Sequence, residues 1–112
     1  MDPEVYIAGV GAITAIGNNV EECLISFEKE EAGMADIVYL DTVHRHKLPV
    51  AEVKLSNKEL IEVTGLPAST PRTTLLSLIG AREALHDAAI ADLSSWRTGF
   101  VSANTVGGMD KS

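Results

Sequence analysis

The chain has 112 residues, of which 46% are hydrophobic, and its 16 acidic and 9 basic residues give a formal net charge of −7. This length fits one domain at most, and the hydrophobic content excludes a disordered chain. The acidic balance argues against nucleic acid as the main partner, because phosphate binding needs a basic face. The apolar runs fall short of the ~20 residues that a membrane span requires. A single cysteine excludes an internal disulfide and favours a cytoplasmic protein.

The chain opens with a predicted strand, a glycine loop and a helix. Residues 5–9 form a short apolar run bounded by glycine, which is typical of a buried strand. Asn18 or Asn19 is a good N-cap for the helix that follows, and Gly33 is expected to end that helix. The apolar residues of this helix recur at helical spacing, namely Val20, Cys23, Leu24 and Phe27.

The middle of the chain predicts two weaker strands and then two helices. The strand-like segments "MADIVYL" and "KLPVAEVKL" are separated by the polar run "HRHK". Ser56 and Glu59 form a capping box, and Gly65 closes the short helix that they begin. For the next helix, of about five turns, we expect Thr70 as the cap and Pro71 at the first helical position.

Small side chains form a patch on this long helix, and a further predicted strand follows the helix. Gly80, Ala81 and Ala84 would let another backbone approach closely. Residues 98–108 then predict a strand that runs into a second glycine loop. Because the chain stops directly after this loop, we expect it to be part of something larger.

The order of these elements predicts an α/β fold. Strands that alternate with amphipathic helices imply right-handed crossovers, and hence a β-α-β-α-α-β unit with a largely parallel sheet. Both glycine loops would then lie at the carboxyl ends of strands, where such folds bind their ligands.

The first glycine loop could bind a nucleotide or could be a tight strand-to-helix corner. Gly9 and Gly11 give G-x-G, but position 14 is Thr14 rather than the third glycine, and the next glycine is Gly17. The loop is also long and apolar, so it offers few amides to a pyrophosphate. We therefore favour the corner and keep a small nucleotide-binding unit as a further hypothesis.

The other reactive side chains predict no catalytic or metal site. Cys23 lies on an apolar helical stripe, where core packing is the better interpretation. His44 and His46 belong to a basic tetrad that we expect to be an exposed loop, available to an acidic partner. A zinc site would need two more ligands, and His86 lies far along the chain. Trp96 is interpreted as a packing residue.

Three stretches together resemble the β-ketoacyl-acyl-carrier-protein synthases. "VYIAGVGAITAIGNN" is similar to their opening strand and glycine loop, with Gly9, Gly11 and Gly17 at the glycine positions and Ala15 where the family usually has proline. "PRTTLLSLIGAREALHDAAI" is similar to their second long helix, including Arg72 and the run at residues 81–85. "TGFVSANTVGGMD" resembles the next strand and its glycine loop, although the family more often has glycine at positions 103 and 105.

The resemblance implies a 3-oxoacyl-acyl-carrier-protein synthase of the thiolase-like superfamily. Its fold has two halves stacked in α-β-α-β-α layers, of which residues 1–112 would be an incomplete N-terminal segment. The reaction is a decarboxylative Claisen condensation between an acyl thioester and malonyl-acyl-carrier protein, in fatty-acid or polyketide synthesis. Members are typically homodimers, and no cofactor is implied.

The resemblance also implies which site residues this segment holds. The family's nucleophilic cysteine and its two histidines correspond to no residue of this chain, including Cys23, so residues 1–112 carry no catalytic residue. Val106 matches an apolar position that lines the acyl pocket, and Gly107 and Gly108 complete that substrate-binding loop. As part of a synthase, the segment would form a homodimer or a complex with the remainder of the synthase. The alternative is a non-catalytic assembly module that pairs with another synthase subunit.

Overall fold

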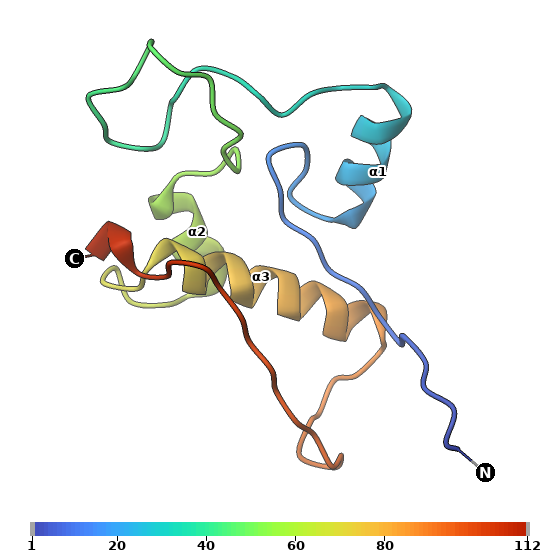
Figure 1. Cartoon of the computed structure of the whole chain (residues 1–112). Coiled ribbons are helices and arrows are strands. Elements are labelled where there is room, and N and C mark those ends of the chain that lie inside the picture. Colours follow the sequence, from blue (N-terminus) through green and yellow to red (C-terminus); the bar gives the residue numbers. More distant parts are fainter. Residues whose placement is uncertain (1, 112) are drawn as a thin grey trace.

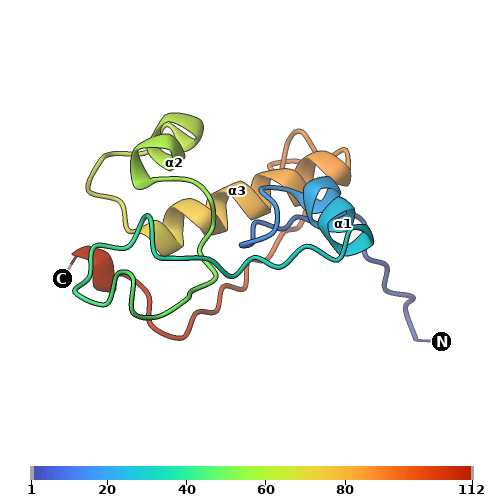
Figure 2. The same ribbon diagram turned by 90° about the horizontal axis from the view of Figure 1, so that it is seen from above.

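The computed structural model describes residues 2–111, in which three α-helices and one short 3-10 helix are joined by long irregular segments. Helix α3 runs through the middle of the molecule (Figure 1). Helix α2 lies against the N-terminal part of α3 and α1 lies beside its C-terminal part, as the view from above also shows (Figure 2). The elements in chain order are α1 (Val20–Glu28), α2 (Asn57–Thr64), α3 (Arg72–Asp87) and η1 (Met109–Lys111).

Helix α1 begins as predicted and ends earlier than predicted. The Asn19 side chain accepts a hydrogen bond from the Glu22 N–H at 2.8 Å, so Asn19 is the N-cap. The helix ends at Glu28, and the expectation that Gly33 ends it is wrong. Gly33 packs closely against the first glycine loop instead. A Cβ at position 33 would lie only 2.7 Å from the Cβ of Ala15, so the position has no room for a side chain.

Helix α2 begins and ends as predicted, with Ser56 as its N-cap and Gly65 at its C-terminal end. The Ser56 side chain accepts from the Glu59 N–H at 3.2 Å, and the Glu59 carboxylate accepts from the Ser56 N–H at 2.7 Å. Hydrogen bonding to the Glu59 carboxylate, first from the Ser56 N–H and then from the Ser56 hydroxyl, holds the pKa of Glu59 below its ordinary value. Gly65 ends the helix in the left-handed region with φ 73°.

Helix α3 begins one residue later than predicted and takes its cap from elsewhere. Pro71 is the N-cap and Arg72 the first helical residue, whereas the Thr70 N–H bonds to the Pro67 carbonyl at 3.0 Å. Proline has no side-chain acceptor, so Asp110, far along the chain, accepts the Arg72 N–H at 3.0 Å. This contact ties the end of the described chain to the start of α3.

The α2–α3 pair is the best-packed part of the molecule. Leu60 on α2 and Leu75 on α3 are both fully buried. Arg82 reaches the C-terminal end of α2, where its Nη2 donates to the Thr64 carbonyl at 3.1 Å. Arg72 reaches the other end, where its Nη1 donates to Asn57 Oδ1 at 2.8 Å. Two arginines of α3 therefore hold both ends of α2.

The predicted parallel sheet is wrong. Among residues 2–111 there is no strand and no sheet, and the nearest approach to one is a pair of isolated bridges, Thr14–Gly17 and Ala35–Val50. The predicted strands at residues 5–9 and 98–103 make no hydrogen bond to another backbone segment. Apolar content gives a segment strand propensity, but a strand is stable only beside other strands, and these two segments are not paired. The observed arrangement is therefore not the β-α-β-α-α-β half of a thiolase-like layered fold.

Much of the apolar surface stays uncovered. The buried hydrophobic side chains among the described residues are Cys23, Ile37, Leu60 and Leu75. Val5 is 91% exposed, and Val101 is 96% exposed. The Cα radius of gyration is 16.4 Å, against about 13 Å for a compact domain of this length. Within residues 2–111, no helix combines the length and the apolar character needed to cross a membrane.

Candidate functional site

The opening glycine segment lies directly on α3. A Cβ at Gly9 would lie 2.3 Å from the Ala84 carbonyl oxygen, and one at Gly11 would lie 2.0 Å from the Gly80 carbonyl oxygen. No side chain fits at such distances, so only glycine permits this approach. The prediction that the small-residue patch of α3 receives another backbone is confirmed.

Carboxylates of α3 bind the backbone of this segment. Glu83 accepts the Ala12 N–H at 2.9 Å with Oε2 and the Val20 N–H at 2.7 Å with Oε1. Asp87 accepts the Val10 N–H at 3.0 Å. The amides that a pyrophosphate would need are thus taken by fixed negative charges, which argues for the corner and against a nucleotide site.

Cys23 lies inside this corner. Its side chain is buried, and its Sγ lies 3.2 Å from Thr14 Oγ1 and 3.6 Å from the Gly17 carbonyl oxygen. A thiol held in this way packs the glycine loop onto α1. The interpretation of Cys23 as a core residue is confirmed.

The loop predicted to bind substrate lies at the N-terminal end of α3. The Gly107 N–H donates to Asn104 Oδ1 at 2.9 Å, and the Gly108 N–H donates to Thr73 Oγ1 at 3.3 Å. Gly108 has φ 79°, in the left-handed region that favours glycine. The side chain of Val106 is 61% exposed, so it does not line an enclosed cavity here. The role of Val106, Gly107 and Gly108 in substrate binding stays a prediction.

A cavity of about 530 Å³ opens at the same end of α3. Arg72 forms part of its wall, donating to the Val53 carbonyl at 3.1 Å as well as to Asn57, with its guanidinium 6.0 Å from the centre of the Tyr39 ring. The cavity lies within the volume range of about 300–1,000 Å³ that ligand pockets have. Its lining residues are Tyr39, Leu40, Asp41, Ala51, Glu52, Val53, Asn57, Arg72, Leu76 and Asp110.

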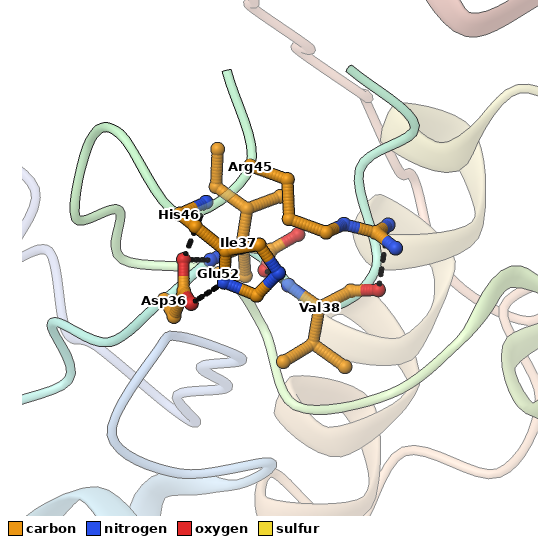
Figure 3. A network of polar contacts seen from close by, with 6 residues as sticks. All are labelled: Asp36, Ile37, Val38, Arg45, His46 and Glu52. Atoms are coloured by element: carbon orange, nitrogen blue, oxygen red, sulfur yellow. Dashed lines mark hydrogen bonds and ion pairs between the residues drawn. The ribbon is translucent and has the colours of Figure 1, made fainter. Parts of the chain in front are cut away.

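Side chains hold the far wall of this cavity in an extended shape. Glu52 Oε1 accepts the Val38 N–H at 2.7 Å, and its Oε2 accepts the Tyr39 and Leu40 N–H groups at 3.1 and 2.8 Å. On the carbonyl side, Arg45 Nη2 donates to the Val38 carbonyl at 3.3 Å (Figure 3). The same nitrogen donates to the Leu40 carbonyl at 3.1 Å. Within the predicted strand "MADIVYL", Ala35 pairs with the Val50 backbone, whereas both edges of residues 38–40 are bonded to side chains.

Asp36 and His46 close the base of this loop. The His46 ring is paired with the Asp36 carboxylate, which also accepts the Ile37 and His46 N–H groups, each at 3.0 Å (Figure 3). The hydrogen bond from the His46 ring, aided by these amides, lowers the pKa of Asp36. His46 has φ 65°, which few residues other than glycine adopt, and its two contacts with Asp36 hold it there.

Glu52 is the most heavily bonded carboxylate in the loop. Partial burial raises its pKa, but the N–H groups of Val38, Leu40 and Tyr39 oppose this effect, and the pKa is lowered overall. The roles of Glu52 and Asp36 were not predicted from the sequence. One feature of the sequence could have indicated these roles: Asp36 and Glu52 each lie inside an apolar, strand-like run, which is an unusual place for a charged side chain.

The histidines are not brought together with the cysteine. His44 and His46 lie in an exposed loop, as predicted, and His86 lies on α3 at the edge of a groove beside α1. Across residues 2–111, no three metal-ligating side chains of the His, Cys, Asp or Glu type converge. The exposed Trp96 is 64% accessible, so the interpretation of it as a packing residue is wrong for this structure.

Comparison of the chain with protein-family models, with curated proteins and with solved structures finds no match.

Proposed function

We propose that this chain is part of a 3-oxoacyl-acyl-carrier-protein synthase, to which it contributes scaffold and part of the acyl pocket. The observation that carries the proposal is the contact between the opening glycine segment and α3. Gly9 and Gly11 meet the backbone of Gly80 and Ala84 at distances that no other residue permits. The opening glycine segment and the long helix α3, which each resemble a part of the synthases, are thus complementary in shape.

The third stretch that resembles the synthases, at residues 98–110, contacts the N-terminal end of the same helix, α3. Gly108 bonds to Thr73, and Asp110 bonds to the first N–H of α3 at Arg72. In the proposed role, Val106 contacts the acyl chain, and the absence of side chains at Gly107 and Gly108 leaves room for that chain.

The chemistry of the proposed reaction is shared with residues outside this segment. A synthase cysteine takes the acyl group from the phosphopantetheine thioester of a carrier protein. Malonyl-carrier protein then loses carbon dioxide, and the resulting carbanion attacks the new thioester with release of the cysteine thiolate. Cys23 is buried and hydrogen-bonded, so its thiol is unsuited to this role. The acyl-carrier protein is the proposed partner, the cytoplasm the proposed compartment, and a homodimer or a complex with the remainder of the synthase the proposed assembly.

A complementation experiment tests this function. A 3-oxoacyl-acyl-carrier-protein synthase shortened by its own N-terminal segment is mixed with this chain, and carbon dioxide release from malonyl-carrier protein is measured. We expect activity only in the mixture, and we expect Val106→Trp to lower it by blocking the pocket while Val63→Ala, an exposed change on α2, leaves it intact. A mixture that neither associates nor reacts would overturn the proposal.

A second candidate function is a non-catalytic assembly module. The exposed apolar segments at residues 5–8 and 100–101, which have no backbone partner, favour it. The same experiment separates the two candidates. Binding of the shortened synthase without restored activity supports the assembly module and contradicts a contribution to the acyl pocket.

A further inference from the structure

A groove of about 490 Å³ lies between α1 and the C-terminal half of α3. Its apolar surface is accessible, with Leu24 56% exposed, Ile25 42% exposed and Val10 48% exposed at its lining. Glu21 and Glu28 stand at its rim on α1. The groove therefore combines an apolar floor with an acidic edge.

The two rim carboxylates on α1 are available to a partner. Glu83 and Asp87, on the α3 side, already accept backbone N–H groups of the opening segment. The side chains of Glu21 and Glu28 make no hydrogen bond or ion pair within the described residues. They are seven residues apart and so lie on one face of α1, with Leu24 between them. A cationic segment with apolar flanks has the complementary chemistry.

The chain itself carries such a segment at the opposite end of the molecule. Residues 43–48 read "VHRHKL", the one basic cluster of an acidic sequence. Val43 is 81% exposed and Leu48 is 56% exposed. The side chains of His44 and Lys47 have no partner among residues 2–111. This loop and α1 lie far apart in both views, so the segment does not reach the groove of its own chain (Figures 1 and 2).

We propose that residues 43–48 of one copy dock in the α1–α3 groove of a second copy. Lys47 and His44 would approach Glu21 and Glu28, while Arg45 stays bonded to the Val38 and Leu40 carbonyls. The flanking Val43 and Leu48 would cover the apolar floor. Charge complementarity favours this occupant over an unrelated partner, because one chain presents both surfaces. Since the two surfaces differ, the contact is head-to-tail and produces rings or open chains rather than a two-fold dimer.

Salt dependence separates this contact from association through the bare apolar segments. Sedimentation equilibrium of the whole chain is measured at about 0.05 M and about 0.5 M salt, where the Debye length falls from more than 10 Å to less than 5 Å. Docking through the groove weakens at high salt. Association that is unchanged or stronger at high salt is apolar in origin and would overturn the proposal.

A charge swap provides the decisive test. Glu21→Lys with Glu28→Lys makes the rim basic, and His44→Glu with Lys47→Glu makes the segment acidic. We expect each double variant alone to associate about tenfold more weakly than the unchanged chain, because like charges then face each other. An equimolar mixture of the two should regain the association, since the swapped rim and the swapped segment are again complementary.

Two controls make the swap interpretable. Asp2→Lys with Glu62→Lys changes the net charge by the same amount as Glu21→Lys with Glu28→Lys, but at exposed positions outside the groove, and should leave association unchanged. Circular dichroism checks that α1 survives in the Glu21 and Glu28 variant, and Glu21→Gln with Glu28→Gln gives a milder version that keeps good helix formers. Failure of the mixture to associate, or a monomeric chain that binds only unrelated cationic peptides, would overturn docking between copies.

Discussion

Two apolar glycine-containing segments run along α3, and only one of them is anchored. Residues 5–12 place Gly9 and Gly11 against the α3 backbone, and Glu83 and Asp87 bind their amides. Residues 99–106 border a cavity of about 320 Å³ beside α3, with Phe100 81% exposed. The described backbone of residues 98–103 makes no hydrogen bond. Similar apolar content therefore gives different outcomes, because close backbone approach and fixed acceptors decide which segment docks.

The largest expected effect is the loss of the glycine contact. Gly11→Val brings a side chain into the space of the Gly80 carbonyl and should destabilise the fold by about 3 kcal/mol, near the upper end for overpacking. Urea unfolding followed by circular dichroism measures this change. Gly99→Val is the matched control, because a Cβ at Gly99 meets open space, and it should change stability by less than about 0.5 kcal/mol. Equal losses for the two variants would remove the distinction between the segments.

Removing the carboxylate that binds the anchored segment should have the next largest effect. Glu83→Gln keeps the shape of the side chain but loses the charge that strengthens two hydrogen bonds, to Ala12 and Val20. We expect a loss of about 2 kcal/mol in the same unfolding measurement. Glu62→Gln, at an exposed position on α2, should be neutral. A neutral Glu83→Gln would show that the glycine contact and the Asp87–Val10 hydrogen bond hold the segment without Glu83.

Acid should release the loop that Glu52 holds while the helices remain. The pKa of Glu52 is lowered in the folded chain, so its stabilising contribution is present above the unfolded value of about 4.3 and is lost as the pH falls through the lower folded value. The pKa of Asp36 is lowered too, and its contribution changes in the same direction. The amide NMR signals of Val38 and Leu40 should shift in one step below a pH of about 4. Persistence of that step in Glu52→Gln would assign it to Asp36 instead.

The smallest effect is expected in the unanchored segment. Phe100→Ala should change stability by less than about 0.5 kcal/mol, because the ring is mostly exposed and little area is lost. Urea unfolding measures this change. A loss of stability above about 2 kcal/mol is typical of truncating a buried side chain, and it would mean that the Phe100 ring is buried against α3 and that this segment is anchored after all.

Local signals in the sequence predicted the helices well. The capping box at Ser56 and Glu59, the N-cap at Asn19 and the stop at Gly65 all involve contacts within four residues, so the chain needs no distant partner to form them. The burial of Cys23 and the small-residue patch of α3 were also predictable, since both follow from helical spacing.

The features that could not be predicted from the sequence depend on contacts between residues far apart along the chain. Strand propensity at residues 5–9 and 98–103 did not produce a sheet, because pairing requires a neighbour that no local pattern specifies. The acceptors for the backbone came instead from Glu83 and Glu52, whose partner amides lie at least 12 residues away along the chain. Asp110 capped α3 where Thr70 was expected, again over a long sequence separation.

Amide hydrogen exchange, followed residue by residue with NMR, tests the anchoring most directly. Ala12 and Val20, whose N–H groups are bound by Glu83, should exchange far more slowly than Val101 and Ser102, and Glu83→Gln should remove the difference. Equal exchange rates at all four amides in the unchanged chain would contradict the account.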